Sequence, residues 1–198
     1  SLDLENFHFS SFHFFTFHEF CNLKELSFVD CSAERKINHA DLFKRLGRLE
    51  TLNIREFSDF FNEIPSNVFD DLENLTRLDI SKNKLIEINP EWFSRLQKLE
   101  RLDLSDNKIN LLTKEMFRHL TNLTNLCMNA NEFNQLDDGA FSHLRSLEYL
   151  DISFNDTILE FKPQLFDGLD KLGNLLIRNM NENFQLDVDS FQALPSLK

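Results

Sequence analysis

Three histidines near the start of the chain are the first residues whose type could support chemistry. His8, His13 and His18 recur every five residues in a phenylalanine-rich stretch, and imidazole rings can bind a metal ion or change charge near neutral pH. A spacing of five places successive side chains on different sides of either a helix or a strand. The three rings therefore do not converge, and we expect exposed histidines and no metal site.

Three cysteines, Cys21, Cys31 and Cys127, cannot all pair with one another, and they show no zinc or redox spacing. A predicted strand that includes Leu26 and Phe28 separates Cys21 from Cys31. An extended segment of that length holds the two Cα atoms beyond the ~7 Å limit for a disulfide. We expect Cys31 to pack as a small apolar residue. Cys127 is expected on the outward side of a strand, either as an exposed thiol or paired with a part of the protein outside this sequence, so the disulfide pairing stays open.

Motifs of the common enzyme classes are missing from the sequence. It has no phosphate-binding loop, no dinucleotide-binding fingerprint, no zinc-protease motif and no nucleophile elbow. Its four glycines cannot build a phosphate-binding loop. We therefore predict a protein that is not an enzyme and that uses no cofactor.

A repeat of 24 to 26 residues runs through the whole chain and must position all of these residues. Four consecutive units carry the pattern Leu-x-x-Leu-x-Leu-x-x-Asn, with isoleucine or methionine at the third leucine position in three of them. A second pattern, Phe-x-x-Leu-x-x-Leu, ends on the same leucines and extends the repeat toward both ends. The repeat anchors are Leu23, Leu49, Leu75, Leu99, Leu123, Leu147, Leu172 and Leu197. The pattern resembles the leucine-rich repeat.

This repeat predicts a solenoid. Two apolar residues two positions apart point to the same side of a short strand. One repeat cannot enclose these leucines, whereas stacked repeats bury them behind a parallel sheet. The predicted fold is an α/β-type solenoid, a leucine-rich repeat horseshoe of about eight repeats with a parallel concave β-sheet and a mostly irregular or short-helical convex side. Eight strands give a sheet roughly 34 Å across, and the phenylalanines fill the wider, opposite side of the coil.

Asparagine ends the pattern in four consecutive repeats, at Asn83, Asn107, Asn131 and Asn155. Its amide can satisfy backbone groups of the turn and of the next repeat. That bonding explains how the chain turns with only four glycines. In the flanking repeats the same position holds other residues, namely Phe7, Cys31, Phe57 and Met180. Those turns need another solution, such as water or a changed backbone.

The domain organisation follows from the repeat. We predict one domain over residues 1–198, in which residues 1–74 are the less regular part. The chain begins within a predicted strand and stops at the opening of a further repeat, without the capping units that keep solenoids soluble. We therefore expect both caps to be missing and the sequence to be a segment of a longer protein.

The concave face is the candidate binding surface, because solenoids present extended curved surfaces to macromolecules. Its outward positions alternate with the buried leucines of each strand. Arginine and tyrosine often anchor interfaces, whereas Asp-x-Ser is also a common filler of this repeat. The candidate ligand-binding residues are Arg55, Arg77, Asp79, Arg101, Asp103, Asn125, Asn129, Tyr149, Asp151 and Arg178.

The balance of charge bears on the class of partner. The chain has 21 Lys and Arg against 33 Asp and Glu, a formal net charge of −12. Such an excess of acid repels a nucleic-acid backbone and an anionic membrane surface. No apolar run approaches the ~18–20 residues that span a bilayer. We expect a protein ligand, no nucleic acid, and a membrane only through a span outside this sequence.

Three sequons of the form Asn-x-Thr begin at Asn74, Asn122 and Asn155. Asn74 and Asn122 occupy the same repeat position, just before a strand, at an edge of the coil from which a glycan could project. Asn155 belongs to the asparagine column, whose amides are expected to bond inside the turn. We therefore predict glycosylation at Asn74 and Asn122 and an unmodified Asn155.

The 24-residue repeats with phenylalanine spines resemble the extracellular typical class of leucine-rich repeat proteins. Residues 63–75, Glu-Ile-Pro-Ser-Asn-Val-Phe-Asp-Asp-Leu-Glu-Asn-Leu, follow an irregular phenylalanine-rich lead-in. This stretch resembles the N-terminal half of insect Toll receptor ectodomains. The resemblance implies a glycoprotein ectodomain of a single-pass membrane receptor that binds a Spätzle-like cystine-knot cytokine and signals in innate immunity or development by receptor pairing, as a homodimer on its ligand. Two alternatives are a soluble secreted leucine-rich immune protein and an adhesion or matrix protein that binds another protein.

Overall fold

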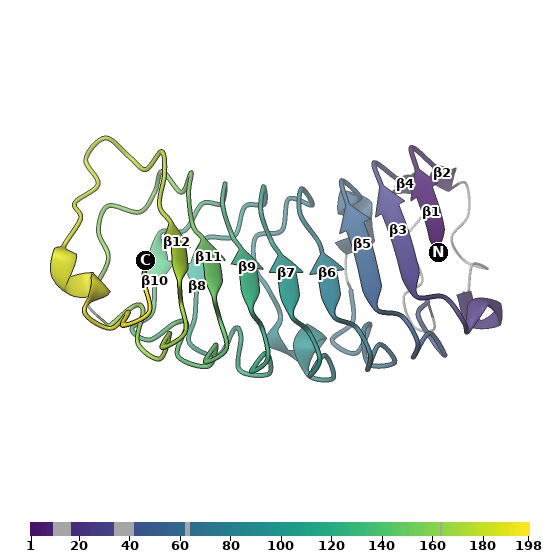
Figure 1. Ribbon diagram of the computed structural model, residues 1–198. Coiled ribbons are helices and arrows are strands. Elements are labelled where there is room, and N and C mark those ends of the chain that lie inside the picture. Colours follow the sequence, from purple (N-terminus) through teal and green to yellow (C-terminus); the bar gives the residue numbers. More distant parts are fainter. Residues whose placement is uncertain (10–16, 34–41, 62–63, 163) are drawn as a thin grey trace.

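The computed structural model describes residues 1–9, 17–33, 42–61, 64–162 and 164–198. Eight parallel strands form one sheet, and their order in the sheet is their order in the chain (Figure 1). These strands are β1 (Leu2–Glu5), β3 (Glu25–Val29), β5 (Thr51–Arg55), β6 (Arg77–Asp79), β7 (Arg101–Asp103), β9 (Asn125–Cys127), β11 (Tyr149–Asp151) and β12 (Asn174–Leu176). Each strand lies beside the strand of the next repeat, as stacking of identical units requires.

The register of the sheet joins equivalent repeat positions. Leu78 of β6 lies opposite Leu102 of β7, and Leu102 lies opposite Leu126 of β9. The predicted leucine-rich repeat solenoid is therefore confirmed. The predicted count of about eight repeats is slightly high, because eight strands are joined by only seven connecting segments.

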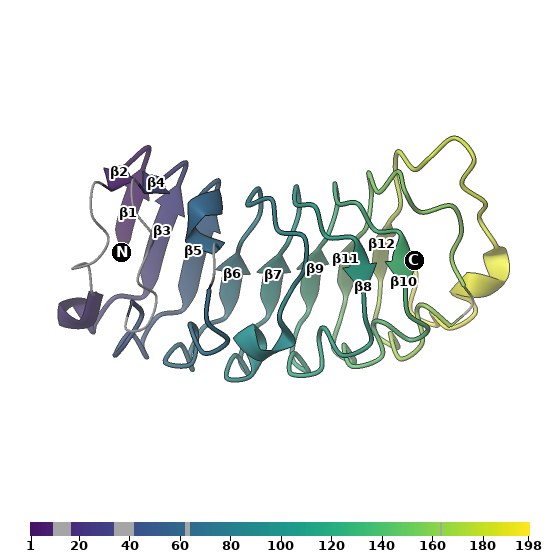
Figure 2. The same ribbon diagram turned by 180° about the vertical axis from the view of Figure 1, so that it is seen from behind.

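Where the structure describes the rest of the coils, it is mostly irregular or short-helical, as predicted. Two small parallel ladders lie outside the main sheet, β2 (His8–Phe9) with β4 (Ser32–Ala33) and β8 (Leu111–Leu112) with β10 (Gln135–Leu136). Figure 2 shows β8 and β10 on the side away from the eight-stranded sheet. The described residues also form single-turn 3₁₀ helices, which are η1 (Phe17–Phe20), η2 (Ser58–Phe61), η3 (Pro90–Phe93) and η4 (Val188–Phe191).

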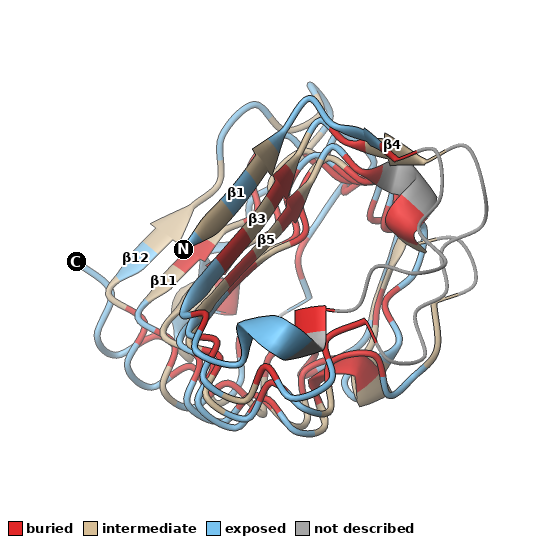
Figure 3. Ribbon diagram, turned by 90° about the vertical axis from the view of Figure 1, so that its right-hand side faces the viewer, coloured by how far each residue is buried: buried red, intermediate tan, exposed pale blue. Residues whose placement is uncertain are grey.

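The core lies between the sheet and the opposite wall of the coil, where buried residues line the interior (Figure 3). Leucines of the strands fill one side of this core. Phenylalanines fill the other side as a stack, with ring centroids 6.2 Å apart between Phe117 and Phe141 and between Phe141 and Phe166. Phe191 continues the stack at 6.0 Å from Phe166. Steps of 24 or 25 residues thus place one ring above the next, in the offset arrangement that aromatic pairs favour.

The asparagine column is buried and fully bonded. The Asn107 side-chain oxygen accepts hydrogen bonds from the backbone N–H groups of Asn83 and Leu85, at 2.9 and 3.0 Å. Its side-chain nitrogen donates to the carbonyls of Ile80 and Leu104. Each amide therefore ties its own turn to the preceding coil, which confirms the predicted role of the asparagines.

A second device makes the turns without glycine. One residue just beyond each strand of the main sheet has a positive φ between 49° and 58°, and none of these residues is glycine. They are Asn6, Asp30, Glu56, Lys82, Asp106, Ala130, Phe154 and Asn179. The N–H of most of them donates to the next coil, as in the Lys82 to Ser105 carbonyl bond of 3.0 Å. The asparagine column alone is thus an incomplete explanation of the turns, because left-handed residues share the task.

This left-handed position gives a testable prediction. Phe154 has a φ of 58° and a ring that is 49% exposed. A left-handed conformation costs ~1–2 kcal/mol for most L-residues and less for asparagine. The change Phe154→Asn is therefore expected to raise the free energy of unfolding by about 0.5–1 kcal/mol, measured by urea denaturation. An unchanged or lower stability would show that the Phe154 ring contributes more by packing than its backbone costs.

The irregular repeats replace the asparagine in different ways. Cys31 is buried, and its thiol donates to the carbonyl of Leu4 at 3.2 Å, so sulfur takes over one of the amide's bonds. Phe57 is fully buried and fills the space with its ring. Its backbone N–H donates to the Asn83 side chain at 2.8 Å. Cys31 is therefore buried as predicted, but its thiol acts as a hydrogen-bond donor and not only as an apolar group. The first regular asparagine, Asn83, bonds the last irregular turn.

Candidate ligand-binding face

The outer surface of the eight-stranded sheet, which we call the sheet face, carries the predicted site residues. Most lie within strands β5 to β11, while Asn129 and Arg178 lie two residues beyond β9 and β12. The register places Arg77 beside Arg101 and Asp79 beside Asp103. The strands therefore present two neighbouring columns of opposite charge, one of arginines and one of aspartates.

A shallow hollow of about 350 Å³ lies at the centre of the sheet face. It brings together six of the predicted residues, which are Arg77, Asp79, Arg101, Asp103, Asn125 and Tyr149. The structure leaves Arg55, Asn129, Asp151 and Arg178 outside its lining. Three further polar residues line it: Thr51, Asn53 and Cys127. Their repeat positions were the sequence signal for these three residues, because the register of the sheet places them in the same columns as Arg77 and Asp79.

The two arginines of the hollow are available to bind a ligand. Arg77 and Arg101 are exposed, and neither makes an ion pair or side-chain hydrogen bond with any described residue. Deeper in the same face, the Oδ1 of Asn53 and the Nε of Arg55 are buried without a hydrogen-bond partner in the described chain. The Arg55 Nε has only the Glu56 carboxylate at 3.7 Å. Buried polar atoms without partners are rare in folded proteins, so this face retains unused bonding capacity.

The alternation along each strand predicts that the serines of the Asp-x-Ser units face solvent, and this prediction is wrong. Ser81, Ser105 and Ser153 are 4%, 7% and 2% exposed. The side chain of the aspartate two residues earlier accepts a hydrogen bond from the serine N–H, at 2.9 Å between Ser105 N and Asp103 Oδ1. An aspartate that bonds the backbone two residues on closes a local turn. These aspartates therefore have a structural task beside any contact with a ligand.

Asp103 shows how the hollow affects a charge. Burial raises the pKa of the Asp103 carboxyl above its usual range, and the Asp79 charge adds to this, against the lowering by its Ser105 hydrogen bonds and by Arg55. Because the pKa is higher in the folded chain than in the unfolded one, the folded state binds this proton more tightly. The protonated form therefore adds stability as pH falls through the raised pKa, and ionisation of Asp103 at neutral pH opposes folding.

Cys127 lies in the hollow, half-buried between the aspartate-bearing strands. Burial, followed by the charges of Asp103, Asp151 and Asp79, raises the pKa of its thiol to about 12. The thiolate is the nucleophile in alkylation. With a pKa of about 12, about one Cys127 thiol in ten thousand is ionised at pH 8.

We therefore expect iodoacetamide at pH 8 to label the exposed Cys21 first and Cys127 at least tenfold more slowly, measured by mass spectrometry of the native chain. Urea-unfolded chain, in which both thiols are solvated, should show similar rates and is the control. Equal rates in the folded chain would contradict the raised pKa of Cys127.

The other candidate groups are the cysteines and the histidines, and they form no site among the residues that the structure describes. All three cysteines are free in the structure, so Cys21 and Cys31 are not paired. The Nδ1 of His8 hydrogen-bonds the Ser32 hydroxyl at 2.7 Å. His13 and the His18 side chain lie outside the described residues. Within the described part of the chain, no group of three His, Cys, Asp or Glu side chains could hold a metal ion.

The sequon asparagines differ in accessibility. Asn74 and Asn122 both lie at the edge where strands begin, and each side-chain nitrogen donates to a carbonyl of the previous coil, Gly47 at 2.5 Å and Gln97 at 2.8 Å. Asn122 is exposed, and Asn74 is partly exposed. Asn155 is fully buried, and its side-chain nitrogen donates to Met128, Ile152 and Ser153. The position of Asn155 inside the turn is thus as predicted from the column.

Comparison with known proteins assigns the family. The leucine-rich repeat family model matches residues 73–133 and 122–182. Together these matches cover residues 73–182, which is more than half of the chain. The chain therefore belongs to the leucine-rich repeat family.

Solved structures place the fold near Toll-like receptor ectodomains and bacterial repeat proteins. The chain aligns over its whole length with TLR13 from the TLR13–ssRNA13 complex, at 26% identity and a TM-score of 0.68. It also aligns over 96% of its length with a chain of the Toll–Spätzle complex of Drosophila, at 23% identity and a TM-score of 0.65. A leucine-rich repeat protein of Leptospira interrogans aligns over 91%, at 24% identity and a TM-score of 0.75.

These alignments cover only a part of each neighbour. The chain spans 31% of the TLR13 chain, 28% of the chain from the Toll–Spätzle complex and 43% of the Leptospira protein. No curated protein sequence matches this chain. Among the helices of the described residues, none is long and apolar enough to cross a bilayer.

Proposed function

We propose that this chain is the ligand-binding part of the ectodomain of a Toll-like receptor of innate immunity or development, located outside the cell or at its surface. The observation that carries the proposal is the pair of unpaired, exposed arginines, Arg77 and Arg101, above the hollow of the sheet face. The alignment with TLR13 over the whole chain supports the receptor class. The ligand would be a protein, specifically a Spätzle-like cystine-knot cytokine.

The sheet face suits a protein ligand with mixed charge. Arg77 and Arg101 offer guanidinium groups to carboxylates, which they can bind in a bidentate manner. The aspartate column beside them would receive lysine or arginine side chains, while Tyr149 supplies an amphipathic anchor. Two receptor copies paired by one ligand would then transmit the signal through parts of the protein outside this sequence.

Nucleic acid is a weaker candidate as the ligand. The TLR13 neighbour was solved with ssRNA13, but the present chain has a net charge of −12. Phosphate contacts dominate affinity for nucleic acid, and an acidic protein repels them. We therefore expect the binding partner to be a protein.

The test compares two double variants in binding to a recombinant Spätzle-type cystine-knot cytokine by surface plasmon resonance. Arg77→Ala with Arg101→Ala is expected to weaken binding by at least about tenfold, because interface arginines are frequent hot spots. Arg95→Ala with Arg145→Ala removes the same charge from exposed positions outside the sheet face and is the control. Undiminished binding by the first variant would rule out this site, and no binding by the unmodified chain would rule out this ligand class.

The extracellular location predicts a glycosylation pattern. When the chain is secreted from insect cells, peptide mapping is expected to find N-linked glycans at Asn122 and Asn74 and none at Asn155. The buried Asn155 nitrogen makes three hydrogen bonds that a glycan would break. A glycan at Asn155 would contradict its placement in the turn, and bare Asn74 and Asn122 would count against the extracellular assignment.

A further inference from the structure

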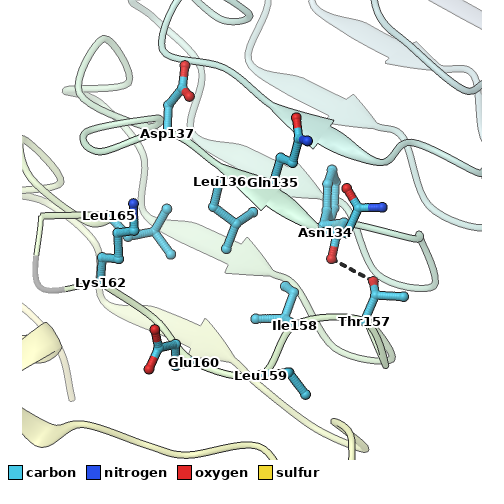
Figure 4. Close-up of a pocket in the computed structure, with 11 residues that line it drawn as sticks. Asn134, Gln135, Leu136, Asp137, Thr157, Ile158, Leu159, Glu160, Lys162 and Leu165 are labelled. Carbon is cyan, nitrogen blue, oxygen red and sulfur yellow. Dashed lines mark hydrogen bonds between the residues drawn. The ribbon is translucent and has the colours of Figure 1, made fainter.

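A second hollow lies on the wall opposite the sheet face, between β10 and the following coil. Its volume is about 490 Å³, and its lining combines apolar side chains, such as Leu136, Ile158 and Leu165, with charged ones (Figure 4). This hollow shares no lining residue with the hollow of the sheet face. It interrupts an otherwise regular ladder of backbone hydrogen bonds between coils.

The ladder is visible in the preceding coils. Lys108 N–H donates to the Leu85 carbonyl at 2.7 Å, and Glu132 N–H donates to the Ile109 carbonyl at 3.0 Å. The equivalent bond to the Phe133 carbonyl comes instead from the Thr157 hydroxyl, at 2.5 Å. Within the described chain, no backbone hydrogen bond joins residues 133–138 to residues 156–162. The ladder resumes one coil later, where Gln185 N–H donates to the Leu159 carbonyl at 2.7 Å.

An inserted residue explains the interruption. The coil from Leu147 to Leu172 has 25 residues, one more than each of the three preceding coils. Two residues after the column asparagine, the earlier coils carry an apolar residue, such as Ile109 or Phe133, and this coil carries Thr157. Ile158 takes the buried position instead, at 4% exposure. The extra residue therefore displaces the backbone of this coil from the register that would bond to β10.

The displacement leaves two main-chain edges unpaired across the hollow. Gln135 and Asp137 donate their N–H groups toward β8, to Asn110 and Leu112. Because alternate residues of a strand direct their main-chain groups to opposite sides, Leu136 directs its N–H and carbonyl toward the hollow. On the other side of the hollow, Glu160 lies beside Gln185 of the next coil in a parallel bridge. The bond of this bridge runs from the Gln185 N–H to the carbonyl of Leu159, the residue before Glu160.

By the same alternation, Glu160 directs its N–H and carbonyl back toward β10. Neither Leu136 nor Glu160 has a main-chain hydrogen bond to a described residue on the hollow side.

We propose that this hollow binds a short extended peptide that enters as an added strand between β10 and Glu160 and that carries alternating apolar and basic residues. An unpaired strand edge is a template for another chain, and such addition derives its affinity from main-chain hydrogen bonds and its specificity from alternate side chains. The apolar residues of the peptide pack on Leu136, Ile158 and Leu165.

The charge of the rim selects basic residues. Asp137 and Glu160 line the hollow, and the one basic lining residue, Lys162, has its ammonium 3.6 Å from the Asp138 carboxylate. The rim is therefore negative overall, and complementary charge favours a lysine- or arginine-bearing peptide. Leu159, which is 55% exposed at the edge of the hollow, would be covered by the same peptide.

The probe is a short capped peptide of alternating valine and lysine, and its valine–glutamate counterpart is the control. We expect saturable binding of the lysine peptide and slower amide exchange at Leu136 and Glu160, measured by NMR. Glu160→Lys is expected to weaken binding about tenfold. Glu87→Lys, which reverses an exposed acid on an earlier coil of the same wall, should leave binding within about twofold.

Deletion of Thr157 restores a 24-residue coil and should abolish binding by closing the hollow, while circular dichroism shows that the chain remains folded. Arg77→Ala with Arg101→Ala should bind the peptide as the unmodified chain does, which separates this site from the sheet face. Lack of saturable binding, equal affinity for the glutamate peptide, or unchanged binding after Glu160→Lys would each overturn the proposal.

Discussion

Replacing Asn107 by alanine is expected to lower the free energy of unfolding by about 4 kcal/mol. The side chain is 6% exposed and joins two coils, accepting from Asn83 and Leu85 and donating to Ile80, Leu104 and Ser105. Alanine leaves the N–H groups of Asn83 and Leu85 buried without partners. Each unsatisfied buried donor costs ~1–3 kcal/mol, and the lost bonds to the carbonyls add to that cost.

Asn110→Ala is the matched control for this prediction. Asn110 lies three residues further along the same coil, is partly exposed, and makes no side-chain hydrogen bond to a described residue. Its replacement should change the unfolding free energy by no more than about 0.5 kcal/mol. Urea denaturation monitored by circular dichroism measures both changes. Equal and small effects would mean that water or the backbone can replace the amide, and that the column does not tie the coils together.

Phe141→Ala is expected to cost about 3–5 kcal/mol, the range for removing a fully buried phenylalanine. Phe141 is fully buried, and its ring stacks on Phe117 on one side and Phe166 on the other, each at 6.2 Å. The change opens a cavity in the middle of the stack. The neighbouring rings cannot move into it, because each is held at its position along the solenoid by its own coil. Since repeats of a solenoid contact only their neighbours, the loss should appear first in the coils next to Phe141.

Hydrogen exchange locates this loss along the solenoid. Amides of the coils that carry Phe117, Phe141 and Phe166 should exchange faster in the variant, while those of β3 and β5 should keep their rates. Phe20→Ala, at a ring that is 51% exposed, should cost well under half as much and serves as the control. A uniform increase of exchange over the whole chain would show that the solenoid unfolds as one cooperative unit.

The proposed sites on the two walls rest on different departures from the ideal repeat. On the sheet face, the departures are the side chains of Arg77 and Arg101, which stand at positions that need no particular residue for folding. On the opposite wall, the departure is the one-residue insertion at Thr157, which changes the backbone. A surface variant on one wall should leave the other wall unaffected, because the two hollows share no lining residue.

The sequence alone determined the fold class, the register and the columns of this protein. Leucines two residues apart fix which side of each strand is buried, and the 24-residue period fixes which residues lie side by side. Arg77 beside Arg101 and the buried Asn155 follow directly from these two local rules.

Tertiary structure decided the features that depend on hydrogen bonds between coils. The burial of Ser105 under the Asp103 carboxylate, and the left-handed residues such as Phe154, arise where a strand must turn into the next segment. The hollow beside Leu136 depends on how the backbone of the following coil accommodates its extra residue. Sequence spacing shows that a residue is added, but only contacts with the neighbouring coil determine which bonds are lost and what space opens.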